Sequence, residues 1–432
     1  MFAYYFDLAI RSLKRNVALT ILMIVAIAFG VGASMTTLTV LHVLSADPIP
    51  GKSHELYYVQ IDPRKAAGYR PGDEPPNQLT RLDAENLLRA HLGDRQAMMT
   101  GGSAAIDPQK PPLEPFFVDA RWTSADFFAM FRVPFLGGTG WTSEDDTKAS
   151  RVVVIARALA EKVFGTTAVV GRTLRVGDTD MRIVGVTEDW RPIPHFYDLN
   201  VDKFGKGEQL FMPFSTSREM KLDRSGEMNC WDEHSDPEAV GAPCEWIQYW
   251  VELGSAQKAA DYKSYLVRYS EEQKRAGVFQ VAPNVRLRDV VQWLTYKRVV
   301  PDDVRLQTWI ALGFLLVCLV NTVGLLLTKF LRRAAEIGVR RALGASKRSI
   351  FIQLLVEAGA IGLVGGAAGL GLAWLGLWAV RHQPAEYAYL AHLDLPMLGA
   401  TFGLAVIATV LAGLLPAWRG CQISPAIQLK SH

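Results

Sequence analysis

The residues with the most distinctive spacing are cations gathered in one short segment between two apolar stretches. The segment Glu336–Ile350 reads EIGVRRALGASKRSI and contains Arg340, Arg341, Lys347 and Arg348. These side chains form no catalytic pattern, and the chemistry open to them is contact with a partner. Cations clustered in a short loop between membrane spans are typical of the cytoplasmic side. We therefore expect this segment to lie in the cytoplasm.

The same segment carries the signals of a short helix with defined ends. Residues 334–343 are rich in helix formers, Gly344 can end that helix in the left-handed conformation, and Ser346 can cap the start of the next one. A short, stiff, basic helix at the membrane surface is suited to act as a lever for a cytoplasmic partner. The alternative is a loop whose charge only sets the membrane topology. Charge alone, however, would not require glycines at 338 and 344.

Patterns that would indicate an enzyme do not occur in the sequence. Its eight histidines are scattered, and no HExxH, G-x-S-x-G, kinase or paired metal-ligand pattern is present. Ala46–Ser53 ends like a phosphate-binding loop, but Ala46 replaces the first glycine, and Pro48 and Pro50 lack backbone amide donors. No other segment offers a Walker motif. We expect a non-catalytic chain without an ATPase site, a metal or a cofactor of its own.

Composition indicates a few membrane spans together with one large water-soluble part. The chain has 432 residues, is 50% hydrophobic and has a formal net charge of +3. Its mean hydropathy of +0.12 is too low for a chain lying entirely in the membrane and too high for a typical soluble enzyme. The basic residues cluster beside apolar segments rather than on one extended patch. We therefore expect no nucleic-acid partner.

Hydropathy along the chain predicts an α-helical membrane protein with four transmembrane helices. An α+β extracytoplasmic domain at 46–300 is inserted between the first and second of them, and both termini lie in the cytoplasm. A cleaved signal peptide is the alternative for the first apolar stretch, which is much longer than such peptides need. The expected order is an interfacial helix at 1–16, spans at 17–45, 306–331, 353–380 and 397–416 (the last closed by Pro416), a cytoplasmic loop and helix at 332–350, a short external loop at 381–396 and a cytoplasmic tail at 417–432.

The large domain shows strand and helix signals in an order that suggests an α+β fold. Leu56–Ile61 and Arg151–Ile155 are rich in β-forming residues, and 171–186 reads as a hairpin that turns at Gly177 and Asp178. Helices are expected at 80–92, 156–164 and 259–275. No long series of alternating strands and helices is present, which argues against a parallel α/β sheet.

Residues 189–246 change in character and read as a variable inserted subdomain. Cys230 and Cys244 flank its polar part. Outside the reducing cytosol a disulfide between them is the default, and closing such a loop would contribute roughly 3 kcal/mol. The alternative is a zinc site formed by His234 with Asp232 or Glu233, although this spacing matches no common zinc pattern.

The third apolar stretch carries small residues at helical spacing. Gly362 with Gly366, and Gly365 with Gly369, are i, i+4 pairs that allow close helix packing. Glycine is also tolerated in membrane helices in general, and both explanations can hold. Glu357 lies near the start of this stretch, and we interpret it as an interfacial residue that faces the cytoplasm rather than as a functional group within the membrane.

The basic loop also resembles a family signature. MacB/FtsX-type ABC-transporter permeases carry a loop of the form E-I-G-x-R-[RK]-A-[LI]-G-A where they contact the ATPase. The segment Arg151–Val186 is similar to the periplasmic core domain of this family, and Leu414–Lys430 is similar to its C-terminal ending. The signature is matched here by Glu336, Ile337, Gly338, Arg340, Arg341, Ala342, Leu343, Gly344 and Ala345.

The resemblance implies a permease of the inner membrane that exports a small molecule, peptide or antibiotic. An ABC ATPase, expected as a separate subunit, would bind ATP and Mg²⁺ and push on 336–350. The permease would work as a dimer with a second copy or a paralogue, in contact with membrane lipid. A periplasmic membrane-fusion adaptor and an outer-membrane channel are further partners in this family. Arg340 and Arg341 would contact the ATPase, while Gly338 and Gly344 would shape the lever.

Other functions share parts of this layout. An FtsX-like regulator of cell-wall hydrolases would have a much smaller external domain than 46–300. A LolC/LolE-like permease for lipoprotein release has the same four spans and stays open as an alternative. A sensor would need a cytoplasmic signalling domain after the second span, and none is found there.

Overall fold

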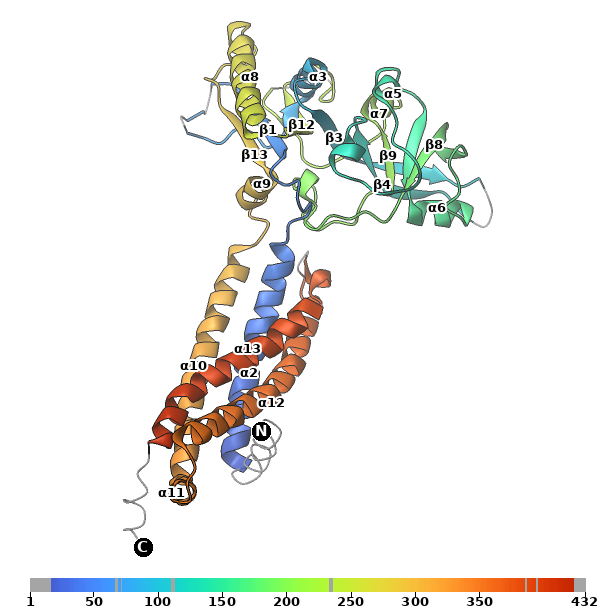
Figure 1. Cartoon of the computed structure of the whole chain (residues 1–432). Coiled ribbons are helices and arrows are strands. Elements are labelled where there is room, and N and C mark those ends of the chain that lie inside the picture. The colour runs from blue at the N-terminus through green and yellow to red at the C-terminus, as the bar shows by residue number, and fades with distance from the viewer. Residues whose placement is uncertain are drawn as a thin grey trace. The chain divides into compact units, whose positions relative to one another are not determined.

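A computed structural model gives the fold (Figure 1). The chain separates into two compact units. We call Met1–Ser45 together with Val300–His432 the helical unit, and Ala46–Val299 the sheet unit. The interfacial helix expected at 1–16 and the tail beyond 422 lie outside the described residues. The residues described are 17–66, 69–70, 72–109, 113–232, 236–384, 387–393 and 395–422.

Among the described residues, four helices are long and apolar enough to cross a membrane. The shortest has 27 residues, which is about 40 Å at 1.5 Å per residue and exceeds the roughly 30 Å of a bilayer core. They pack side by side in the helical unit (Figure 1). The four are α2 (Val17–Leu44), α10 (Asp302–Arg332), α12 (Lys347–Arg381) and α13 (Leu395–Cys421).

The glycines of α12 occupy two faces that contact two different helices. Gly362 and Gly366 face α13, and a Cβ added to Gly366 would lie 2.8 Å from the Ala405 side chain. Gly365 and Gly369 face α2, and a Cβ on Gly365 would lie 2.8 Å from an α2 side chain. Because real Cβ atoms do not approach this closely, each pair permits a helix contact that alanine would obstruct.

Pro416 does not end the fourth helix, contrary to the interpretation of the sequence. It lies inside α13, which continues to Cys421. Proline lacks an amide hydrogen and disrupts helices in water. In membrane proteins, neighbouring helices and local adjustments compensate for the freed backbone group. Pro416 is buried, so packing against the other helices supports this position.

The sheet unit is built on a mixed sheet with helices and loops around it. Within its described part the principal strand order is β13-β1-β12-β3-β4-β9-β6-β8-β5. Most neighbours are antiparallel, but β4 with β9 and β6 with β8 are parallel. The strands are β1 (Leu56–Ile61), β2 (Leu79–Thr80), β3 (Arg95–Asp107), β4 (Phe116–Thr123), β5 (Phe135–Gly138), β6 (Val152–Ala156), β7 (Thr173–Val176), β8 (Thr179–Thr187), β9 (Leu210–Pro213), β10 (Arg224–Ser225), β11 (Asn229–Cys230), β12 (Cys244–Glu252) and β13 (Val285–Asp289).

The core of this unit follows from strand position and helix amphipathicity. Every residue of β12 is buried, as expected for a strand with neighbours on both sides and cover on both faces. In α8, the buried Tyr262 and Leu266 face the core while the rest of the helix is largely polar. The helical segments are α3 (Arg81–Ala90), α4 (Phe127–Met130), α5 (Ser143–Thr147), α6 (Arg157–Phe164), η1 (Phe196–Asp198), α7 (Phe214–Glu219), α8 (Ala256–Arg275) and α9 (Val290–Tyr296).

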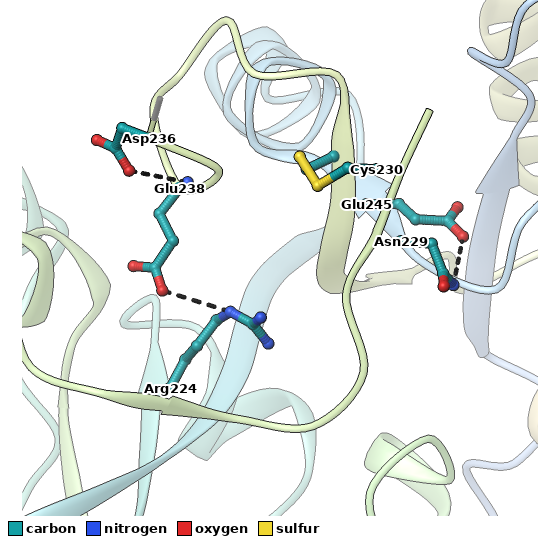
Figure 2. The surroundings of a disulfide bond; sticks show 7 residues. Arg224, Asn229, Cys230, Asp236, Glu238 and Glu245 are labelled. Carbon is teal, nitrogen blue, oxygen red and sulfur yellow. Dashed lines mark hydrogen bonds and ion pairs between the residues drawn. A yellow bond between two sulfur atoms is a disulfide. The ribbon is translucent and has the colours of Figure 1, made fainter. Parts of the chain in front are cut away.

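A disulfide joins Cys230 on β11 to Cys244 on β12 and closes the loop between them (Figure 2). Beside it, the Asn229 side-chain amide donates to the carboxylate of Glu245 at 3.1 Å. The alternative zinc site included His234 and Glu233, which lie outside the described residues. In the described part of the chain, no group of three or more His, Cys, Asp or Glu side chains is arranged to hold a metal ion.

Candidate functional site

The basic segment forms α11 (Ala334–Ala342), between α10 and α12. Leu343 caps its C-terminus, and Gly344 follows with a φ of +102°. The amide of Gly344 donates to the Arg341 carbonyl and the amide of Ala345 to the Arg340 carbonyl, both at 3.1 Å. This pair of bonds is a Schellman motif, which favours glycine in the left-handed position. The end of α11 is therefore fixed by its own hydrogen bonds.

The residue after Ala345, Ser346, is the N-cap of the next helix, α12. Ser346 accepts a hydrogen bond from the amide of Ser349 at 3.2 Å and caps α12. Because a capped end and a capped start are separated by so few residues, α11 connects to α12 through a short and well-defined turn. The turn between α11 and α12 is thus fixed by hydrogen bonds at both of its ends.

The two faces of α11 differ sharply in exposure. Ile337 and Gly338 are buried, and Ile337 belongs to the apolar core of the helical unit. On the outer face, Val339 is 54% exposed and Leu343, four residues later, is 83% exposed. Residues spaced i, i+4 lie next to one another on a helix. Together they form an apolar ridge, which we define as Val339 and Leu343.

Of the other signature residues, Ala342 and Gly344 are exposed, and Arg341 and Ala345 are half-buried. Arg340 is also half-buried, and its guanidinium lies 2.8 Å from the Glu336 carboxylate and 3.2 Å from the Gln353 side-chain oxygen on α12. The sequence interpretation assigned Arg340 to contact with an ATPase. In the structure Arg340 also ties α11 to α12.

Glu357 departs from the sequence interpretation. It does not face the cytoplasm at the interface, because its side chain is 1% exposed. Its carboxylate lies 2.8 Å from the ammonium of Lys329 on α10 and 2.9 Å from the guanidinium of Arg333. Burying an acid in this region is costly unless it is paired. The only sequence signal was a lone acid in an apolar stretch, which does not reveal its partners on another helix.

A second buried charge cluster lies within the sheet unit and was not anticipated from the sequence. Arg121 on β4 forms ion pairs with Asp198, at 2.5 Å, and with Glu208. Its guanidinium also lies over the ring of Tyr197, 5.2 Å from the centroid. Burial acts to raise the pKa of Glu208, but the Arg121 charge, together with His195 and the Tyr197 hydrogen bond, more than offsets burial and holds that pKa well below its usual range. The cluster ties β4 to the irregular region after β8.

A polar cavity of about 150 Å³ adjoins this cluster. Arg121, His195 and Glu208 are among its lining residues. The sheet unit holds a second cavity, of about 170 Å³, lined in part by Asp146. Burial raises the pKa of Asp146 to about 7, against the opposing hydrogen bonds from the Ala125 amide and the Trp141 indole. Both cavities are small, and we assign neither a ligand.

A bundle of apolar helices, a capped basic helix between two of them and an inserted α+β domain define a class of membrane permease. Comparison with protein families agrees with this class. Residues 20–268 match the model of the MacB-like periplasmic core domain, and residues 309–425 match that of the FtsX-like permease C-terminal domain. The first match covers more than half of the chain. The chain belongs to the MacB/FtsX-type ABC-transporter permeases, which are membrane proteins with a periplasmic domain.

Individual relatives are distant. The probable syringafactin export ATP-binding/permease protein SyfD of Pseudomonas syringae pv. tomato is 25% identical over 365 residues, covering 83% of this chain and 49% of the relative. The macrolide export ATP-binding/permease protein MacB of Azoarcus sp. is 24% identical over 431 residues, covering 98% of this chain and 59% of the relative. The chain thus spans about half to three-fifths of the length of these curated relatives.

The crystal structure of the periplasmic region of MacB from Actinobacillus actinomycetemcomitans is similar with a TM-score of 0.36 and 13% identity. The similarity covers 56% of this chain and 92% of that one.

Proposed function

We propose that this chain is the permease component of a MacB-like exporter, in which an ABC ATPase acts on α11 and the sheet unit responds. The exported substrate is a small molecule, peptide or antibiotic, which agrees with the export functions for which the relatives are named. The observation that carries the proposal is α11 itself. It is a rigidly capped basic helix that joins two candidate membrane helices and exposes an apolar ridge.

The α11 surface has the properties of a helix that docks in a groove. Val339 and Leu343 provide apolar contact area, and the cations around them suit an acidic rim. The 432 residues contain no Walker motif, so the nucleotide site is supplied outside them. ATP and Mg²⁺ bind to the ATPase, which we propose is a separate subunit. The permease pairs with a second copy or a paralogue, and an adaptor and an outer-membrane channel complete the export route.

We propose an orientation from charge and chain order. The cations around α11 support a cytoplasmic position for this helix by the positive-inside rule. Since α10 crosses the membrane before α11, the sheet unit that precedes α10 in the sequence lies on the periplasmic side. The ends of the chain then lie in the cytoplasm. The sheet unit is inserted between α2 and α10, so a shift of either helix reaches it directly through the chain.

The test is a double substitution, Val339→Glu with Leu343→Glu, on the apolar ridge. Two carboxylates there remove the apolar contact but leave the buried face of α11 unchanged. We expect membrane insertion to be retained and co-purification of the ATPase to fall at least about tenfold, which corresponds to about 1.4 kcal/mol of binding free energy. Val278→Glu, at a 49%-exposed position in the sheet unit, is the matched control. Co-purification of the double variant at the wild-type level would refute the docking role of α11.

A further inference from the structure

Five ionisable side chains of alternating sign run in an unbroken series through the helical unit. We call Lys329, Glu357, Arg333, Glu336 and Arg340 the ion-pair chain. The Lys329 ammonium lies 2.8 Å from Glu357, whose other oxygen lies 2.9 Å from Arg333. Arg333 then contacts Glu336 at 3.3 Å, and Glu336 contacts Arg340 at 2.8 Å. The chain thereby connects α10 and α12 to α11.

Exposure rises steadily along the ion-pair chain. The side chains of Lys329 and Glu357 are 0% and 1% exposed, that of Arg333 is 11% exposed, and those of Glu336 and Arg340 are 28% and 35% exposed. The series therefore runs from the interior of the helical unit to the surface of α11. At its inner end the Lys329 ammonium also lies 3.4 Å from the Thr20 hydroxyl, which brings α2 into the same network.

The inner pair is an expensive arrangement for a merely structural role. Removing two charges from water is costly, and apolar residues of similar volume often stabilise a fold equally well. Ionisable residues at membrane depth are therefore rare and usually functional. Glu357 is placed so that one carboxylate contacts two cations, Lys329 in α10 and Arg333, the residue that joins α10 to α11. Apolar substitutes could not make that double contact.

We propose that the ion-pair chain holds α11 in a fixed position against α10 and α12, so that displacement of α11 moves these helices as one body. Glu357 and Arg333 are the positioning residues, because their contact joins the inner pair to the part of the ion-pair chain that lies on α11. This inference rests on the proposed function in one respect, namely that an ATPase is what displaces α11. The fixed position of α11 itself does not depend on an ATPase.

Hydrogen exchange of the purified full-length permease in lipid nanodiscs tests the fixed position without any partner. Arg333→Gln breaks the connection but leaves the inner pair of Lys329 and Glu357 intact, so the variant should still fold. Arg332→Gln is the matched control, because Arg332 is the adjacent residue, carries the same charge and is exposed. We expect α11 amides to exchange at least about fivefold faster in Arg333→Gln, with exchange in α2 unchanged. Arg332→Gln should match the wild type.

Two further variants keep the test decisive. Glu357→Gln should also accelerate exchange in α11. Arg333→Lys, which keeps the charge but lacks the forked guanidinium, should give an intermediate rate. Wild-type exchange rates in α11 of both Arg333→Gln and Glu357→Gln would overturn the inference. Failure of the wild-type permease to bind any ATPase would instead refute the proposed function, and the exchange result would still decide whether the ion-pair chain holds α11.

Discussion

Two buried acids in the sheet unit, Glu208 and Asp146, make the stability of the fold depend on pH in opposite directions. Glu208 has a pKa held below its usual range by Arg121, so its stabilising contribution is present above the unfolded-state pKa of about 4.3 and is lost on acidification. Asp146 has a pKa raised to about 7 by burial, so it favours the folded state in its protonated form. Its contribution is present below about pH 4 and is lost as pH rises towards 7.

Asp146→Asn should therefore flatten the pH dependence of stability between about pH 4 and 7. Asparagine is neutral throughout this range, whereas wild-type Asp146 must ionise at a cost on the order of a few kcal/mol. The variant loses one of two accepted hydrogen bonds, so its stability at pH 4 should be slightly lower than that of the wild type. Unfolding of the full-length protein by urea, followed by tryptophan fluorescence across this pH range, measures the effect. An equal slope in both proteins would contradict the assignment.

Removing the cation of the buried cluster should be severe. Arg121→Met leaves the carboxylates of Asp198 and Glu208 without their shared partner, and breaking a buried ion pair in this way costs about 3–5 kcal/mol. The comparison is Arg151→Met, which removes an ion pair with Glu219 whose side chains are 39% and 55% exposed. Exposed pairs contribute about 0–1 kcal/mol. The same urea unfolding would show comparable losses for the two variants if the cluster were unimportant.

At the scale of elements, the two glycine faces of α12 define how the helical unit packs. Gly366→Leu should disrupt the contact with α13, because even a Cβ there would lie 2.8 Å from the Ala405 side chain. Gly371→Leu is the control on the same helix, since a Cβ at that position meets nothing within 4 Å. We expect Gly366→Leu to lower the free energy of unfolding by about 1–3 kcal/mol, which is typical of overpacking. The thermal midpoint measured in detergent should fall accordingly. Equal midpoints for the two variants would show that the close approach is unimportant.

The loop closed by Cys230 and Cys244 is a second element with a measurable contribution. Replacing both cysteines by serine should destabilise the sheet unit by roughly 3 kcal/mol, the chain-entropy value for a loop of about 15 residues. Proteolysis between 231 and 243 in the full-length protein, compared with the wild type, reports on this destabilisation. Unchanged protection of this loop in the double variant would contradict a stabilising role for the disulfide.

Local signals predicted the ends of elements better than their contacts. Gly344 and Ser346 marked the boundary between α11 and α12 because caps depend on the chemistry of one or two residues. The prediction that Pro416 ends the fourth helix was wrong, because the effect of this proline on α13 depends on the surrounding helices. The pairing of Lys329 with Glu357 could not be predicted from the sequence. These two residues are 28 positions apart on different helices, and packing decides which sides of those helices face each other. The buried Arg121 cluster could not be predicted either, because its members are also distant in the sequence and are brought together only by folding.

At the scale of the whole molecule, the chain connects the two units at α2 and at α10. The proposed ATPase contact, α11, follows α10 in the sequence. A push on α11 moves α10 and α12 together if the ion-pair chain holds, and α10 directly follows the sheet unit in the sequence. The helical unit need not open a channel for this purpose. What matters is that its helices move as one body, which the glycine faces and the buried ion pairs both favour.

Hydrogen exchange of the sheet unit with and without ATP tests the central claim most directly. The permease is reconstituted in nanodiscs together with the ATPase that co-purifies with it. Because the 432 residues contain no Walker motif, we expect an effect of ATP on residues 46–299 to come from an ATPase that acts on the helical unit. We expect ATP to change exchange in the sheet unit of the wild type, and we expect Arg333→Gln to remove most of this change while the ATPase stays bound. Exchange in the wild-type sheet unit that is the same with and without ATP would contradict this expectation.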